Sequence, residues 1–178
     1  MGRRTPDPLA HPERLTQSVY AYVAYRIGAG HDAEDVTSEA FARALRYRKS
    51  YDASKGTPVA WLLGIARRVI AERAAEDRCT VAEVPDTAAP GALEDESIER
   101  VTMQALVATL NERDRELVAL RYGADLTAAQ IGEILDLSPN AVEVALHRAL
   151  RRLRDELDTA PSKAPHARPS LRTSADGV

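Results

Sequence analysis

"IGEILDLSPNAVEVALHRALRRL", residues 131–153, is the stretch that decides the fold of this chain. Just before it, Thr127 and Gln130 have the spacing of a capping box, which starts a helix. The letters "DLSP" then indicate a tight turn. Ser138 and Pro139 suit the N-cap and the first position of a second helix. The stretch therefore predicts a short helix, a turn and a longer helix, which is the outline of a helix-turn-helix.

The longer helix of this pair has an apolar face and a polar face. At about 100° per residue, one stripe is formed by Val142, Leu146, Leu150, Leu153 and Leu157. The opposite side carries Asn140, Val144, His147, Arg148 and Arg151, and Glu143 lies on the flank between the two faces. In a DNA-binding helix-turn-helix, this polar side would contact base edges in the major groove. The alternative is a helical hairpin whose arginines are simply solvated.

The rest of the chain has the periodicity of further helices and no strand pattern. Proline in a first turn, glycine after a last turn and capping side chains mark their ends. We expect helices from Pro12 to just before Gly28, from near Asp32, from Pro58 (capped by Thr57) to about Arg78, from near Glu96 to about Leu110, and from Asn111 to Gly123.

These elements predict an all-α protein of two small helical domains joined by a flexible acidic linker. The linker is "TVAEVPDTAAPGALED", which has two prolines, a glycine and no periodicity. We expect a disordered lead over 1–11, a first domain over 12–79, the linker over 80–95, a second domain over 96–158 and a disordered tail over 159–178.

Charge is distributed unevenly along the chain, although the net charge is only -3. Residues 43–78 hold nine basic side chains against four acidic ones, and residues 80–99 hold six acidic and no basic ones. The basic block contains Tyr47 and Tyr51, and tyrosine rings between cations suit single-stranded DNA. The alternative is that both rings pack on the domain, and we expect Trp61 to belong to the core.

Residue patterns typical of catalysis or metal binding are missing from the sequence. Four histidines are scattered, the single Cys79 cannot form an internal disulfide, and no phosphate loop or zinc motif is present. We therefore expect no enzyme activity, no metal and no cofactor. No apolar run is long enough to span a bilayer and no signal peptide is evident, so we expect a cytoplasmic protein. The acidic pair Glu34 and Asp35 resembles a protein-docking surface.

Three blocks together resemble the extracytoplasmic-function (ECF) family of bacterial sigma factors. They are "DAEDVTSEAFARAL" (32–45), "AWLLGIARRVIAERAAEDR" (60–78) and "LNERDRELVALRYGADLTAAQIGEILDLSPNAVEVALHRALRRLRDEL" (110–157). The order, the spacing and the linker match, and the likeness covers roughly residues 15–157. It implies that the first domain is sigma region 2, the second is region 4, and the linker passes near the polymerase active-site channel.

The resemblance also implies roles for individual residues and partners. Core RNA polymerase would be bound by region 2 through the β′ clamp helices and by region 4 through the β flap. The clamp-binding residues would be Asp32, Asp35, Val36, Glu39 and Phe41, with Ser38 where glutamine is usual. The promoter −10 element would be melted and read by Arg48, Lys49, Tyr51, Lys55, Arg67, Arg68 and Arg73. The −35 element would be read by Thr127, Ser138, Asn140, Glu143, Val144, His147, Arg148 and Arg151. An anti-sigma factor is the usual regulator.

One departure from the family lies at the start of the reading helix. Members often place a cation, then serine or threonine, then arginine where this chain has Glu143, Val144 and Ala145. Glu143 could accept a hydrogen bond from cytosine, or it could pair with His147 or Arg148. Two other functions stay open at this point: a helix-turn-helix regulator that binds DNA without polymerase, and a helical adaptor with no DNA role. The absence of strands in residues 1–79 argues against the receiver domain that many such regulators carry.

Overall fold

The protein is described by a computed structural model over residues 7–80 and 105–159, and every regular element in these residues is helical. This confirms the all-α prediction. Most of the predicted lead, the linker, the beginning of the helix expected from Glu96, and the tail lie outside the described residues.

The N-terminal module is a bundle of three helices, α1 (Pro12–Ile27), α2 (His31–Tyr47) and α3 (Pro58–Thr80), with a short 3-10 turn, η1 (Arg48–Ser50), after α2. All three helices contact one another. Gly28 ends α1 with φ 95° and Gly30 precedes α2 with φ 129°, a backbone region that favours glycine. The Thr57 hydroxyl accepts a hydrogen bond from the Ala60 amide at 3.3 Å, which confirms the predicted cap of α3.

The C-terminal module contains a helical turn over residues 105–109, α5 (Glu112–Val118), the π-helical segment η2 (Ala119–Gly123), α6 (Ala128–Leu135) and α7 (Pro139–Thr159). Three predicted caps are present. Asn111 accepts from the Asp114 amide, Thr127 forms the capping box with Gln130, and Ser138 accepts from the Ala141 amide at 3.2 Å. Local side-chain hydrogen bonds therefore start all three α-helices where the sequence indicated.

The turn between α6 and α7 is closed by backbone contacts. Asp136 takes a left-handed conformation with φ 56°, and the Leu137 amide donates to the Gly132 carbonyl at 2.9 Å. A Cβ atom on Gly132 would lie 2.4 Å from the Leu137 carbonyl oxygen. Gly132 is thus the residue that lets the turn fold back onto α6.

The apolar stripe of α7 packs against α5 and α6 for most of its length. Val142, Leu146 and Leu153 are buried as expected, and Leu150 is half-buried. Leu157, on the same stripe, is 47% exposed. It lies one turn beyond Leu153, the last residue of α7 in the buried clusters, so α7 extends past the core that it covers.

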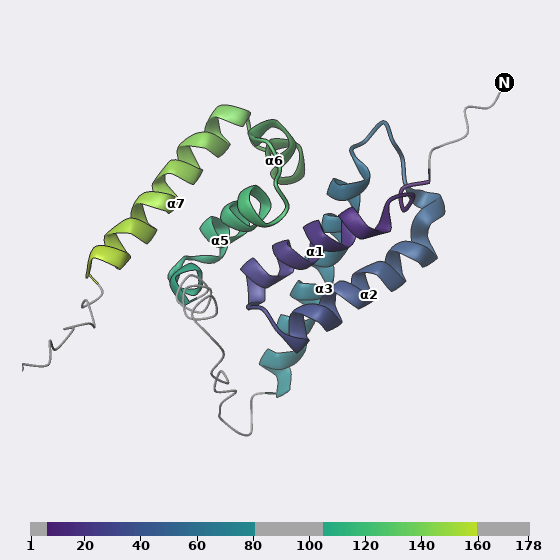
Figure 1. Cartoon of the computed structure of the whole chain (residues 1–178), viewed down its shortest axis with the longest axis horizontal. Coiled ribbons are helices and arrows are strands. Elements are labelled where there is room, and N and C mark those ends of the chain that lie inside the picture. The colour runs from purple at the N-terminus through teal and green to yellow at the C-terminus, as the bar shows by residue number, and fades with distance from the viewer. Residues whose placement is uncertain (1–6, 81–104, 160–178) are drawn as a thin grey trace, which may run out of the picture.

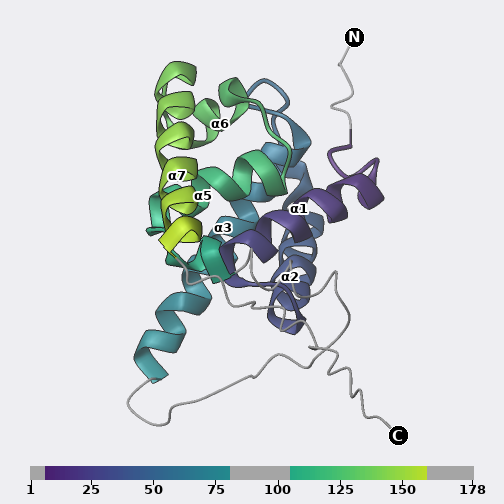
Figure 2. The same cartoon turned by 60° about the vertical axis from the view of Figure 1, so that its left-hand side comes forward.

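The two modules pack directly on each other, an arrangement that the sequence did not predict. Figures 1 and 2 show α5 beside α1 in both views. The η2 segment packs along α1, and α6 touches α3. One cluster of buried side chains runs from the N-terminal bundle into the C-terminal module, so the two halves share a core.

Candidate nucleic-acid interface

The predicted reading face of α7 is exposed to solvent. Its side chains are those of Asn140, Glu143, Val144, His147, Arg148 and Arg151, and the N-cap residues Thr127 and Ser138 are exposed as well. Ala149, on the other side of the helix, is fully buried. The helix-turn-helix therefore presents one continuous side of α7 while the opposite side anchors it to α5 and α6.

Glu143 stands on this face without an opposite charge beside it. Among the described residues it has no ion-pair partner, so the structure does not show the predicted alternative of pairing with His147 or Arg148. Val144, next to it, is a large apolar side chain that is left exposed. The start of the reading helix thus combines a free carboxylate with an apolar contact surface.

The basic side chains predicted to contact the −10 element differ in accessibility. Arg48, Lys49, Lys55 and Arg68 are exposed, whereas Arg73 and Arg67 are half-buried. Within the loop that separates α2 from α3, the Asp52 carboxylate accepts from the Ser54 hydroxyl and amide, and these hydrogen bonds lower the pKa of Asp52. The loop is thus ordered by a local turn, while Lys49 is exposed and the exposed Lys55 lies 4.0 Å from the Asp52 carboxylate.

Tyr51 does not have the position expected of a base-stacking ring. It is 7% exposed, its hydroxyl donates to the Gly56 carbonyl at 3.0 Å, and its ring lies 5.6 Å from the Trp61 ring centre. The ring therefore holds the loop on α3, as in the alternative in which it packs on the domain, and a contact of Tyr51 with DNA stays a prediction. Tyr47 is the exposed tyrosine of this region.

Arg67 is held by a carboxylate of the other module. Its Nε lies 2.9 Å from Oε1 of Glu116, a residue of α5 that is only 7% exposed. The Tyr22 hydroxyl also donates to Glu116, at 3.0 and 3.1 Å, and Nε of Arg26 lies 2.8 Å from its Oε2. We call these four residues the Glu116 cluster. Arg26 additionally donates to the exposed Glu112 carboxylate at 2.8 Å.

The pKa values in this cluster follow from burial and charge pairing. Burial, followed by the nearby Glu116 carboxylate, raises the pKa of Tyr22, so its hydroxyl stays protonated and donates. Burial alone would lower the pKa of Arg26, but the Glu116 and Glu112 carboxylates outweigh burial and raise it. The hydrogen bond from Arg26 lowers the pKa of Glu112.

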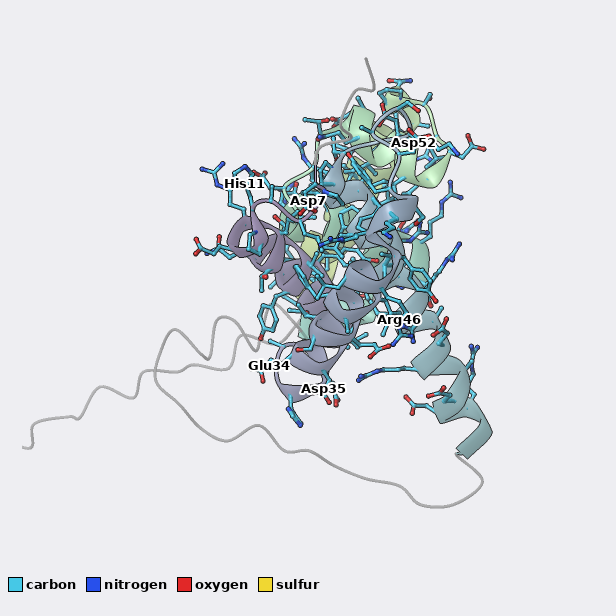
Figure 3. The ribbon with its side chains drawn as sticks, turned by 90° about the vertical axis from the view of Figure 1, so that its right-hand side faces the viewer. Asp7, His11, Glu34, Asp35, Arg46 and Asp52 are labelled. Atoms are coloured by element: carbon cyan, nitrogen blue, oxygen red, sulfur yellow. The ribbon has the colours of Figure 1, made fainter. Side chains whose placement is uncertain are left out.

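The predicted polymerase-binding residues on α2 lie in two environments. Asp32 and Asp35 are exposed in the first turns of the helix, where carboxylates also favour the helix dipole. Figure 3 shows Glu34 and Asp35 pointing away from the body, at the end of α2 far from Asp52. Glu39 is half-buried and bonded to Arg43 at 2.7 Å, which lowers its pKa.

The two apolar members of that predicted set pack inward. Val36 is 0% exposed and Phe41 is half-buried against the core. Val36, which has no exposed surface, holds α2 on the bundle, and its contact with polymerase stays a prediction. The exposed carboxylates remain as candidates for a docking face.

Comparison with known proteins identifies the family of this chain. The family model described as Sigma-70 region 2 matches residues 13–78, and the one described as Sigma-70, region 4 matches residues 100–153. The ECF RNA polymerase sigma factor SigK of Mycobacterium ulcerans is 30% identical over 170 residues, and the match covers 89% of each chain. The chain belongs to the ECF RNA polymerase sigma factors.

Other relatives agree with this assignment. The sigma factor is 34% identical to the ECF RNA polymerase sigma factor ShbA of Streptomyces griseus over 169 residues, and the match covers 86% of this chain and 87% of the relative. It is 32% identical over 149 residues to the ECF RNA polymerase sigma factor BldN of Streptomyces coelicolor. That match covers 79% of this chain but only 56% of BldN, so the chain spans about half of that relative.

Two solved structures share the fold of this sigma factor. The sigma factor RpoE of Bartonella quintana, in complex with the anti-sigma factor NepR, has a TM-score of 0.65 at 17% identity. The match covers 82% of this chain and 93% of RpoE. CnrH, in complex with the cytosolic domain of CnrY, has a TM-score of 0.58 at 21% identity and covers 84% of each chain. Within the described part of this sigma factor, no helix is long and apolar enough to cross a membrane.

The residues that join the modules were missed by the sequence analysis. No sequence pattern indicated a joining role for Tyr22, Arg26 or Glu116. Glu116 and Tyr22 are separated by 94 positions, so no local spacing links them. A carboxylate directly before the apolar run of Leu117 to Leu120 is the one local signal that could have indicated a buried acid.

Proposed function

We propose that this sigma factor binds core RNA polymerase and directs it to promoters, with region 4 reading the −35 element and region 2 melting and reading the −10 element. The supporting observation is the exposed side of α7, which carries Asn140, His147 and two arginines on a capped helix-turn-helix. Such a helix fits a major groove and places side chains at base edges.

The two DNA contacts require different physics. The −35 contact keeps the duplex intact. The −10 contact unpairs bases, which costs about a few kcal/mol, and binding of the unpaired bases to the protein offsets this cost. The exposed Arg48, Lys49 and Arg68 would bind the strand phosphates. The melted strand is therefore expected to be held well only after polymerase has positioned both modules.

Partners of the sigma factor follow from the same proposal. The exposed Asp32 and Asp35 at the start of α2 are candidates to dock on the β′ clamp helices, and region 4 would contact the β flap. Two structures of the same fold were solved as complexes: RpoE with the anti-sigma factor NepR, and CnrH with the cytosolic domain of CnrY. We propose that an anti-sigma factor also controls this chain, and that this chain acts in the bacterial cytoplasm.

The test is reconstitution with core RNA polymerase. The tagged sigma factor should copurify with core polymerase and produce discrete run-off transcripts from a library of genomic fragments. The Arg148→Ala, Arg151→Ala double variant should still copurify but lose most transcripts, because only its −35 surface is changed. Binding of duplex DNA without copurification would support instead a regulator that acts without polymerase.

We expect Glu143→Lys to strengthen duplex binding. The substitution replaces an unpaired carboxylate on the reading face by a cation that can reach a phosphate. One added phosphate contact steepens the slope of log affinity against log salt by about 0.9. Titration of a mixed-sequence duplex between low and high salt measures both effects.

The matched control for this experiment is Glu156→Lys, which makes the same charge change at an exposed position near the end of α7. It should change the affinity much less, because it lies outside the reading face. Equal gains for the two variants would show that net charge alone is responsible and that Glu143 lies outside the interface.

A further inference from the structure

A pocket between the C-terminal part of α1 and the helical turn over residues 105–109 takes no part in the proposed DNA contacts. Its volume is about 470 Å³, in the range of pockets that hold small organic molecules. None of its described lining residues belongs to α7 or to the predicted −10 set. The lining is mostly apolar and includes Ala21, Ala24, Ile27, Val107 and the rings of Tyr20 and Tyr25.

The charged side chains that line this pocket are positive. Among its described lining residues no acid is present, and the two ionised side chains are Arg26 and Arg115. Arg26 is already paired with two carboxylates of α5. Arg115 is half-buried, and its Nη2 donates to the carbonyls of Ala108 at 2.6 Å and Leu110 at 3.0 Å. These hydrogen bonds close the turn before α5, but a carbonyl oxygen carries no full charge, so the guanidinium is not neutralised by them.

Arg115 has no countercharge in the part of the chain that the structure describes. No carboxylate of these residues forms an ion pair with it, and its buried Nε has no hydrogen-bond acceptor. An unpartnered buried charge is costly, and buried polar groups in folded proteins are nearly always satisfied. The pocket therefore has a place for one negative charge. The acids of α5 cannot supply it, because they are bound elsewhere: Glu112 and Glu116 by Arg26, and Asp114 by Arg152 and Asn111.

We propose that this pocket binds a small organic acid, with its carboxylate on Arg115 and its apolar body against α1. Guanidinium and carboxylate form short, charge-assisted hydrogen bonds. One uncompensated arginine balances one negative charge, which favours a monocarboxylate over a phosphate ester with nearly two charges. The small side chains of Ala21 and Ala24 leave space for the apolar body, and its burial adds to the affinity. The site goes beyond the proposed function, because it involves neither DNA nor polymerase.

The first test is calorimetric titration of the full chain with octanoate and with phenylacetate. The two acids share a carboxylate and differ in having an aliphatic or an aromatic body. At least one of them should bind with a saturable heat, and the tighter of the two identifies the kind of body that the pocket accepts. If neither acid bound saturably, the proposal would be overturned.

Two further compounds separate the contributions of charge and apolar body. 1-Octanol lacks the charge, and acetate lacks the body. Each should bind at least about tenfold more weakly than the better acid, because it loses either a charged hydrogen bond or the burial of an apolar group. A 1-octanol affinity equal to that of the better acid would exclude Arg115 as the recognition group and overturn the proposal.

Two variants of the chain test whether the acid lies in this pocket. Arg115→Gln keeps a donor for the two carbonyls but removes the charge, and Ala24→Leu fills the pocket while Arg115 remains. Each should weaken binding of the acid at least about tenfold, whereas Arg115→Gln should leave the affinity for 1-octanol unchanged. Arg113→Gln is the matched control, because it makes the same charge change on α5 at an exposed arginine that does not line the pocket. It should bind the acid like the natural chain.

The variants can also contradict the proposal. An equal loss of acid and 1-octanol in Arg115→Gln would show that the arginine only shapes the turn, and an equal loss of acid in Arg113→Gln would show a general effect of charge. Either result would overturn the assigned site. Far-UV circular dichroism shows whether each variant is folded. If Arg115→Gln is not, Ala24→Leu and the comparison of acid with alcohol on the natural chain decide the question. The run-off experiment tests the proposed function separately.

Discussion

Gly132→Ala is expected to cause the largest loss of −35 binding of any single methyl group added to the chain. The new Cβ would lie 2.4 Å from the Leu137 carbonyl oxygen, which is backbone and has no flexible end that can move away. The clash sits inside the turn that sets α7 relative to α6, and the Leu137 amide is bonded to Gly132 itself. Either the turn opens or α7 rotates, and both outcomes displace the reading face.

The expected cost of Gly132→Ala is about 3 kcal/mol of unfolding free energy, in the upper range for overpacked sites. Duplex affinity is expected to fall at least about tenfold. Urea titration followed by circular dichroism measures the first quantity, and duplex titration of the folded variant measures the second. Gly64→Ala, in open space on α3, should be neutral or stabilising by about 0.5–1 kcal/mol. A Gly132→Ala chain with natural stability and natural duplex affinity would show that the turn tolerates a side chain.

The parts of the fold that the sequence predicted well are those fixed by local interactions. Asn111, Thr127 and Ser138 each cap a helix through a hydrogen bond to an amide three residues away, so their spacing alone carries the information. The exposed side of α7 followed from periodicity, because Val142 and Leu146 had to face the core.

The sequence did not reveal the burial of side chains that are covered by tertiary packing. Tyr47 and Tyr51 lie in the same basic segment, and nothing local says which ring is covered by α3 and which stays in solvent. Val36 occurs in a motif associated with docking, yet its position in the helix turns it to the core. Family resemblance indicates that a segment is used, but not which side chains of the segment reach a partner.

The packing between the modules was beyond sequence reasoning for a different reason. Gly123 was interpreted as a helix stop, because glycine after a helix usually serves its backbone conformation. In the structure its role is to admit the backbone of α1, and a sequence cannot distinguish these two uses of glycine. The pairing of Glu116 with Tyr22 could not be predicted from local sequence either, since the two residues are 94 positions apart.

Leu120→Ala is expected to destabilise the N-terminal module although Leu120 belongs to the C-terminal one. Its side chain is fully buried, and it lies in η2, the segment that packs along α1. Removing a buried leucine side chain costs about 2–5 kcal/mol, because apolar contacts are lost and a cavity remains. Since the buried cluster is continuous across the two modules, they should unfold together and share this cost.

Trp61 makes this coupling measurable, because it is the single tryptophan of the chain and lies in α3. In urea, the fluorescence of Trp61 and the far-UV circular dichroism should shift to the same lower midpoint in Leu120→Ala, with an unchanged slope. Leu157→Ala, at an exposed site of the same module, should stay within about 0.5 kcal/mol. If the Trp61 midpoint stayed in place while the dichroism shifted, the modules would be unfolding independently. The shared core would then be a contact between modules that fold independently. If the fluorescence and dichroism midpoints shift together, any factor that separates the modules must also lower the free energy of unfolding of region 2.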